Sequence, residues 1–194
     1  MRPSAQLVSR LTHAIASTDT ASVLLCSDSS QANDDSASLL ALVQESGVAC
    51  LVANDPTLAA RIGADGVHLP PDTTLYAEAR KTLGAEASIG VFCGFSRDDA
   101  MRLAEAGADY VAFGPEYEGN SDAIDQRAEL IAWWSEIFVV PCVAWNVGNA
   151  EEAARSAARG ADFVAPPLGL WDDDESPRVI AEIDRAIRAS RRTA

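Results

Sequence analysis

Gly63-Ala-Asp-Gly-Val67 is the stretch of sequence that decides the fold, because it recurs as Gly107-Ala-Asp-Tyr-Val111 and Gly160-Ala-Asp-Phe-Val164. Each of the three copies follows a stretch with the apolar spacing of an amphipathic helix and precedes a short apolar run. Glycine readily takes the left-handed conformation that ends a helix, and the chain can then turn at once into a strand. The repeat therefore predicts three helix-to-strand turns.

Other segments of the chain continue the same alternation. Apolar runs typical of strands that are covered on both faces predict further strands at residues 22–26, 49–53, 88–92 and 138–144. Helical spacing predicts helices at residues 4–17, 36–46, 56–62, 74–83, 97–106, 126–137, 149–159 and 177–191. With the three strands that follow the repeats, the order is helix then strand, seven times, and then a final helix.

Regular alternation of helices and strands indicates an α/β fold with parallel strands and crossover helices. The expected architecture is a TIM (β/α)8-like barrel with its working face at the carboxyl ends of the strands. Only seven strands are recognisable, and residues 4–17 form a helix with no strand before it. Either the barrel is open at that seam or the chain starts late. Residues 1–194 are expected to form a single barrel domain.

The composition argues against several classes of partner. The net charge of −14 repels nucleic-acid phosphates and anionic lipid head groups. No apolar run approaches the ~20 residues that cross a bilayer, and no secretory signal is visible, so a cytoplasmic location is expected. The four cysteines lie in apolar runs without metal-ligand spacing, and they are expected to be reduced core residues.

Five motifs carry a resemblance to a known family. They are Asn54-Asp55, Gly63-Ala-Asp-Gly-Val-His-Leu69, Ile89-Gly-Val91, Phe113-Gly-Pro115 and Val140-Pro-Cys-Val-Ala144. In order and spacing, over roughly residues 49–171, they resemble the thiamine phosphate synthase family. The resemblance implies a TIM barrel that joins a hydroxymethylpyrimidine pyrophosphate to a thiazole phosphate, with magnesium, and releases pyrophosphate. The same fold serves the thiazole tautomerase branch of the family.

The resemblance also implies site residues. Asp55 would bind Mg²⁺ together with Asp72, which stands one position out of register with the family's second carboxylate. Contacts with a small-molecule substrate, a thiamine precursor, are expected at strand ends from Asn54, Gly114, Trp145 and Gly169. A homo-oligomer is compatible with the sequence.

Several family positions have changed in ways that remove charge or backbone donors. The family's Gln-Leu-Arg-x-Lys strand corresponds to residues 24–28, which contain no base, and its Gly-Val-Ser serine corresponds to Phe92. Its Gly-Gly phosphate turn corresponds to residues 145–147, and Pro166-Pro167 removes two backbone donors from the last loop. Arg97, a further candidate substrate contact, is the only base directly after the predicted strands. Because phosphate binding calls for cations or N–H groups, weak or lost synthase turnover is expected.

Single residues keep two interpretations. Asp55 could bind magnesium or cap the helix that starts at Pro56. His68 could act as an acid or base, or it could be a hydrogen-bonded structural histidine. Trp145 and Trp171 could stack on a flat ligand or fill a mouth that holds no phosphate. The alternative to an enzyme is therefore a non-catalytic barrel that binds a neutral or aromatic ligand, or a protein partner.

Overall fold

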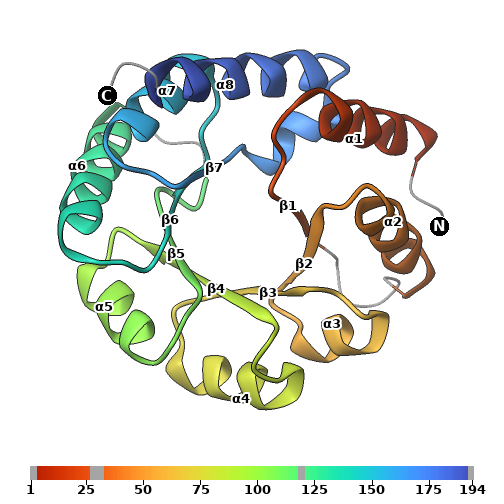
Figure 1. Ribbon diagram of the computed structural model, residues 1–194, viewed down its shortest axis with the longest axis horizontal. Helices are drawn as coiled ribbons and strands as arrows, with labels where there is room; N and C mark the ends of the chain where they lie inside the picture. The colour runs from red at the N-terminus through yellow and green to blue at the C-terminus, as the bar shows by residue number, and fades with distance from the viewer. Residues whose placement is uncertain (1–3, 27–32, 118–120, 192–194) are drawn as a thin grey trace.

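The computed structural model describes residues 4–26, 33–117 and 121–191. Its centre is one sheet of parallel strands, hydrogen-bonded in chain order and curled into an arc (Figure 1). The strands are β1 (Ser22–Leu25), β2 (Ala49–Ala53), β3 (Gly66–Leu69), β4 (Ser88–Gly94), β5 (Tyr110–Phe113), β6 (Cys142–Trp145) and β7 (Phe163–Ala165). The prediction of seven parallel strands in barrel order is confirmed.

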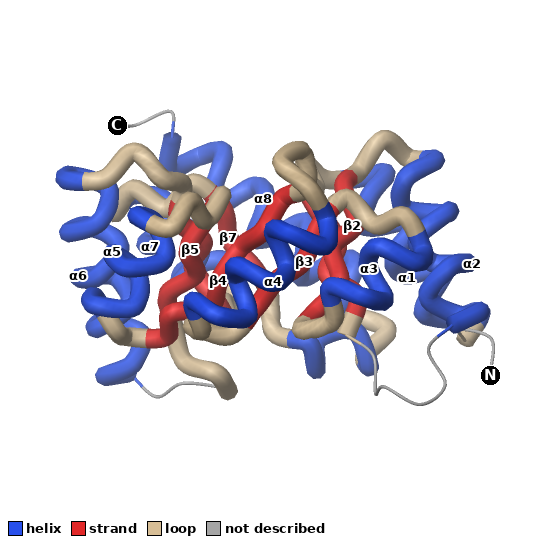
Figure 2. The backbone as a smooth tube through the Cα atoms, turned by 90° about the horizontal axis from the view of Figure 1, so that it is seen from below, coloured by secondary structure: helices blue, strands red, loops and turns tan. Residues whose placement is uncertain are grey.

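Helices surround the arc of strands (Figures 1 and 2). They are α1 (Ala5–Ser17), α2 (Asn33–Glu45), α3 (Pro56–Ile62), α4 (Thr73–Leu83), α5 (Arg97–Glu105), α6 (Ser121–Ile137), α7 (Ala150–Ala158) and α8 (Ser176–Arg191), with a short 3-10 helix, η1 (Leu168–Asp172), before α8. The expected TIM-barrel-like α/β architecture is confirmed. Within the described ranges, no helix has the length and apolarity needed to span a membrane.

The two faces of the sheet have different neighbours. Val67, Val91 and Val111 are fully buried and belong to the main apolar core together with the helix residues Leu103 and Ile131. Because side chains alternate along a strand, the strand residues directly before and after each of these valines point to the opposite face, the barrel interior. Burial on both faces explains why the strands read as continuous apolar runs.

Within the described residues, the sheet has two unpaired edges, at β1 and β7. β1 begins the hydrogen-bonded order, β7 ends it, and residues 5–17 form α1 rather than a strand. In Figure 1 the break in the arc lies between β7 and β1, with α1 and α8 near it. The four residues of β3 are all buried, whereas Phe163 in β7 is 46% exposed. The barrel is open at the seam that the sequence indicated.

The aspartate of each repeat forms the same two hydrogen bonds. Its Oδ2 accepts from a backbone N–H near the start of a neighbouring strand, and its own N–H donates to the carbonyl of that same residue. The pairs are Asp65 with Cys50, Asp109 with Ile89, and Asp162 with Cys142. We call these two bonds the strand-start bracket. It joins β2 to β3, β4 to β5, and β6 to β7.

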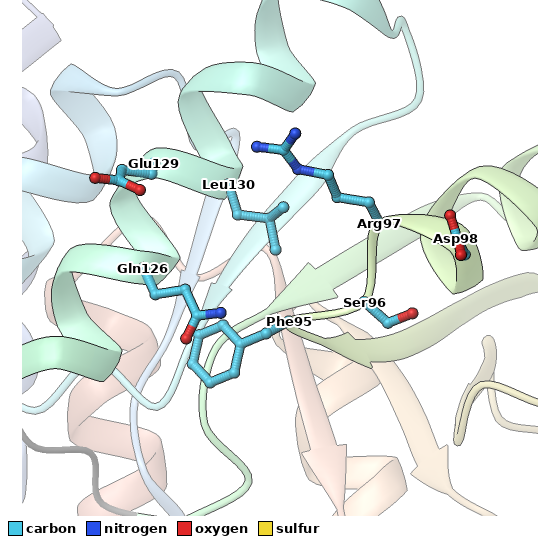
Figure 3. A pocket seen from close by; sticks show the side chains of 7 residues that line it. All are labelled: Phe95, Ser96, Arg97, Asp98, Gln126, Glu129 and Leu130. Carbon is cyan, nitrogen blue, oxygen red and sulfur yellow. The ribbon is translucent and has the colours of Figure 1, made fainter.

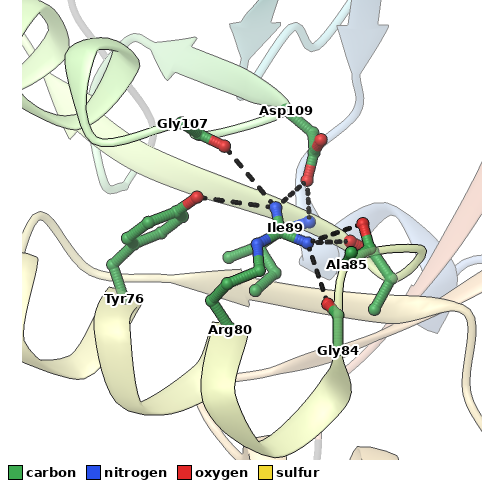
Figure 4. Close-up of polar contacts among 8 residues, drawn as sticks. Tyr76, Arg80, Gly84, Ala85, Ile89, Gly107 and Asp109 are labelled. Carbon is green, nitrogen blue, oxygen red and sulfur yellow. Dashed lines mark hydrogen bonds and ion pairs between the residues drawn. The ribbon is translucent and has the colours of Figure 1, made fainter.

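The glycines of the repeats have the left-handed backbone that was expected. The φ angle is 76° at Gly63, 100° at Gly107 and 98° at Gly160. In the second bracket, Arg80 of α4 donates to the Asp109 carboxylate at 2.7 Å (Figure 4). The repeat therefore ends a helix and fixes the start of two strands within five residues.

Two expectations are corrected by the structure. β6 begins at Cys142 rather than at residue 138, because Phe138 completes the end of α6. Its N–H donates to the Trp134 carbonyl, and its ring stacks on the Trp134 indole with 4.0 Å between centroids. Cys26 is exposed just beyond β1, so it is not a core cysteine, whereas the other three are buried and free as expected. Residues 27–28 of the base-free strand end and residues 118–120 lie outside the described ranges.

Candidate functional site

Asn54 and Asp55 follow β2 at the strand-end face. Asn54 is exposed and has a left-handed backbone with φ of 60°. Asp55 caps α3, because its Oδ1 accepts a hydrogen bond from the Leu58 N–H at 2.8 Å and Pro56 starts the helix. This cap uses one of the two carboxylate oxygens. The magnesium interpretation of Asp55 stays a prediction.

Asp72 lies beyond the end of the neighbouring strand, β3, and caps α4. Its Oδ1 accepts hydrogen bonds from the Thr74 N–H at 2.7 Å and the Leu75 N–H at 3.0 Å. Hydrogen bonds from the Leu75 and Thr74 N–H groups lower the pKa of this exposed carboxyl below its usual value. Among the described residues, no group of three or more His, Cys, Asp or Glu side chains could hold a metal. A magnesium ion here would need further oxygens from water or a bound ligand.

Arg97, the base expected at the strand ends, lies in the helix layer. Its guanidinium carbon is 4.4 Å from the centroid of the Trp133 ring, a cation–π contact between α5 and α6. Figure 3 shows the side chain extending toward α6 beside a cavity of about 430 Å³. Residues 95–98 line one side of this cavity, and Gln126, Glu129 and Leu130 line the other.

Arg127 is a basic residue near the strand ends that sequence reasoning missed. Its side chain is 1% exposed, and its Nη1 donates to the carbonyls of Trp145 at 2.8 Å and Asn146 at 3.1 Å. Its Nη2 forms an ion pair with Glu152 at 2.8 Å. A side chain at Gly114 would not fit here, because a Cβ would lie 2.5 Å from the Trp145 carbonyl oxygen. A signal was present, since Arg127 lies on the same helical stripe as residues 130, 131 and 134, which are all buried.

The turn after β6 is tied to its neighbours on both sides. Asn146 has a left-handed backbone with φ of 56°, and its Nδ2 donates to the carbonyls of Pro115 and Glu116 at 3.0 and 2.9 Å. The Val147 N–H donates to the Ala165 carbonyl at 3.0 Å. The side-chain amide of Asn146 and the backbone N–H of Val147 therefore already donate to carbonyls of the protein itself.

Four rings from four strands contact one another in the barrel interior: His68, Phe92, Tyr110 and Trp145. We call this set the aromatic tier. His68 and Trp145 are parallel, with centroids 4.6 Å apart and 5° between their planes, and Phe92 is tilted against the indole. His68 Nδ1 lies 2.9 Å from the Tyr110 hydroxyl. The Tyr110 ring occupies the space beside Gly90, where a Cβ would lie 1.8 Å from the ring.

Gly169 and Trp171 lie in η1, after β7. Gly169 is exposed. Trp171 packs against the smaller apolar core, which includes Leu11 and Leu40, and its carbonyl accepts a hydrogen bond from Arg10 at 2.8 Å. This packing fits the interpretation of Trp171 as a filling residue.

Comparison with known proteins places this architecture in a family. The family model described as thiamine monophosphate synthase matches residues 3–166. The chain belongs to this family. Two thiamine-phosphate synthases, from Rhodospirillum centenum and Erythrobacter litoralis, are 41% and 42% identical to it over 150 and 147 residues. These alignments cover 76% and 74% of this chain, and 72% and 69% of the two synthases.

Solved structures show the fold of the family. A thiamine phosphate pyrophosphorylase from Pyrococcus furiosus superposes with a TM-score of 0.79 at 19% identity, over 94% of this chain and 90% of that chain. An orotidine 5'-phosphate decarboxylase from Pyrococcus horikoshii OT3 also superposes, with a TM-score of 0.68 at 13% identity over 94% and 93% of the two chains. Because an enzyme with a different name shares the fold, the family assignment rests on the sequence matches.

Proposed function

We propose that this chain is a thiamine-phosphate synthase-like protein of thiamine biosynthesis with weak or lost synthase turnover. The family reaction joins hydroxymethylpyrimidine pyrophosphate to thiazole phosphate and releases pyrophosphate. One observation carries the proposal of weak turnover. The guanidinium of Arg127, which is buried beside the end of β6, is already bound to two backbone carbonyls and to Glu152.

The charges at the strand ends support this proposal. Two phosphorylated substrates call for cations or free N–H groups. Arg97 lies over an indole in the helix layer, and the Val147 N–H is bound to a carbonyl of β7. Asp55 and Asp72 add negative charge unless a metal neutralises them. We therefore expect phosphorylated substrates to bind weakly.

Magnesium is part of the proposal. Asp55 and Asp72 would hold the ion, each through the carboxylate oxygen that does not cap a helix. One or two carboxylates together with substrate phosphates are a usual ligand set for Mg²⁺. When bound, the ion would stabilise charge on the pyrophosphate leaving group. The two aspartates also fix the first turns of α3 and α4, so the caps should persist without the metal.

A synthase assay with both substrates and magnesium tests the proposal, with the R. centenum synthase as positive control. We expect turnover to be lower than the control by at least ~10²-fold, since losing a single preorganised charge contact typically costs about 10²–10³ in rate. Calorimetry with thiazole phosphate should show no saturable heat at millimolar ligand. A micromolar dissociation constant for thiazole phosphate, or rescue of a thiamine-requiring strain, would contradict weak turnover and indicate a fully active synthase.

The aromatic tier favours a second function, a non-catalytic barrel that binds a neutral or aromatic ligand. Trp145, the last residue of β6, brings an indole to the place where the family has a phosphate turn. The ring is only partly buried and lies parallel to His68. Aromatic surface favours flat, uncharged ligands over phosphates. This function predicts ligand binding without turnover.

A further inference from the structure

The cavity between α5 and α6 lies in the helix layer, apart from the barrel interior. Its walls are the first residues of α5 with the loop before them on one side, and one face of α6 on the other (Figure 3). Its volume of about 430 Å³ is typical of small-molecule sites. None of the lining residues belongs to the aromatic tier. A ligand bound here would therefore be separate from any ligand of the barrel interior.

Arg97 is held beside this cavity without a carboxylate partner. Its guanidinium lies over the Trp133 ring, 4.4 Å from the centroid, and it forms no ion pair within the part of the chain that the structure describes. Stacking on an indole covers one face of a guanidinium and leaves the N–H groups in its plane free to donate. This planar fork matches the two oxygens of a carboxylate. Arg97 is therefore positioned to receive a carboxylate.

Two carboxylates line the same cavity. Asp98 comes from the α5 wall and Glu129 from the α6 wall (Figure 3). Neither forms an ion pair with another described residue. The two negative charges disfavour a ligand with excess negative charge, such as a phosphate, and attract a ligand that also carries a cation. One cation and two carboxylates at a single cavity thus favour a zwitterion.

The rest of the lining combines apolar surface with neutral polar groups. Leu130 is 4% exposed, and Phe95 is partly buried against the main core. Ser96 Oγ accepts a hydrogen bond from the Asp99 N–H at 3.2 Å, so its O–H can still donate to a ligand. Gln126 adds an amide that both donates and accepts. An apolar or aromatic group of the ligand fits the ring of Phe95 and the side chain of Leu130.

We propose that the cavity between α5 and α6 binds a zwitterionic amino acid with an apolar or aromatic side chain. Arg97 receives the carboxylate of the ligand, and Asp98 and Glu129 provide the negative charge that its ammonium group requires. Phe95 and Leu130 contact its side chain. The inference depends neither on synthase turnover nor on the second function proposed above, because the site lies outside the barrel interior.

NMR of the indole N–H groups tests the proposal, because two tryptophans report on two different places. Trp133 contacts Arg97 at the cavity, whereas Trp145 lies in the aromatic tier. Spectra of Trp133→Phe and Trp145→Phe identify the two signals. Titration with L-phenylalanine should shift the Trp133 signal saturably in the millimolar range and leave the Trp145 signal in place. Hydrocinnamate and phenethylamine keep the ring but each lack one charge, so they should bind at least about fivefold more weakly.

Matched variants separate the two charges. Arg97→Gln removes the cation and should weaken L-phenylalanine binding at least about fivefold. The double variant Asp98→Asn with Glu129→Gln should weaken it similarly and should abolish the preference for L-phenylalanine over hydrocinnamate. Arg102→Gln is the control, because Arg102 is an exposed base of the same helix that does not line the cavity. This variant should bind like the wild type, and circular dichroism verifies that all variants are folded.

Three results would overturn the proposal. The first is the absence of a saturable Trp133 shift at tens of millimolar L-phenylalanine. The second is a shift of the Trp145 signal instead, which would place the ligand in the barrel interior. The third is equal binding of L-phenylalanine by the wild type and Arg97→Gln, or of L-phenylalanine and hydrocinnamate by the wild type, because the assigned charges would then not select the ligand.

Discussion

Asp109→Ala should destabilise the protein by about 2–3 kcal/mol, because it removes the carboxylate of the second strand-start bracket. Oδ2 of this residue accepts from the Ile89 N–H and from Arg80, both at 2.7 Å. Ile89 is fully buried, and a buried N–H without an acceptor costs ~1–3 kcal/mol. The ion pair adds only ~0–1 kcal/mol, since the Arg80 and Asp109 side chains are 25% and 44% exposed. Figure 4 shows the other acceptors that Arg80 keeps.

Urea unfolding followed by circular dichroism measures this loss of stability. In a thermal melt, the same loss should lower the melting temperature by roughly 4–12 °C. Asp109→Asn keeps an acceptor for the Ile89 N–H and should lose about half as much. Asp162→Ala removes the corresponding bond to the Cys142 N–H and should cost a similar amount. A change in unfolding free energy below ~0.5 kcal/mol for Asp109→Ala, the level of the exposed control Glu86→Ala, would refute the bracket as a stabilising device. A coupling well above ~1 kcal/mol between Arg80→Ala and Asp109→Ala would assign the effect to the ion pair instead.

Other outcomes follow from the barrel interior. Gly90→Ala should cost at least ~1–3 kcal/mol in urea unfolding, because its Cβ would overlap the Tyr110 ring; a neutral change would contradict this. Burial lowers the pKa of His68 to about 4 in the folded protein, so the unfolded chain takes up a proton on this ring at a higher pH than the folded protein does. The free energy of unfolding should therefore decrease as the pH is lowered from about 6.5 to about 4. His68→Phe should lack this part of the pH dependence. Arg127→Ala should cost roughly 3–5 kcal/mol and the exposed Arg155→Ala under about 0.5 kcal/mol, whereas equal costs would contradict a buried pair.

Local sequence patterns predicted the elements of this fold well, because their causes are local. Apolar spacing placed α3 at Pro56–Ile62 and β2 at Ala49–Ala53 without error, and the glycines of the repeats marked the helix ends. The role of the repeated aspartates was not predicted. Asp109 binds the N–H of Ile89, which lies 20 residues earlier in another strand, and apolar spacing carries no information about that pairing.

The candidate site was harder to predict for a similar reason. Sequence reasoning looked for bases only in the segments directly after strands, and it therefore selected Arg97. The direction of a side chain depends on packing between helices, and Arg97 lies over Trp133 in the helix layer. Arg127 reaches the strand ends from within α6, and its partners are backbone carbonyls that no residue type reveals.

The three strand-start brackets all lie at the edge of the sheet where strands begin. They fix the register of the joined strands there, independently of the length of the segments that connect the strands. The repeats are 44 and 53 residues apart, and part of the difference is that α6 has 17 residues where α4 has 11. Extra length has thus been accommodated between two brackets without altering either one. The edge where the strands begin therefore sets the spacing of the strands. The opposite edge, where the strands end, is free to change in length and to acquire new ligands.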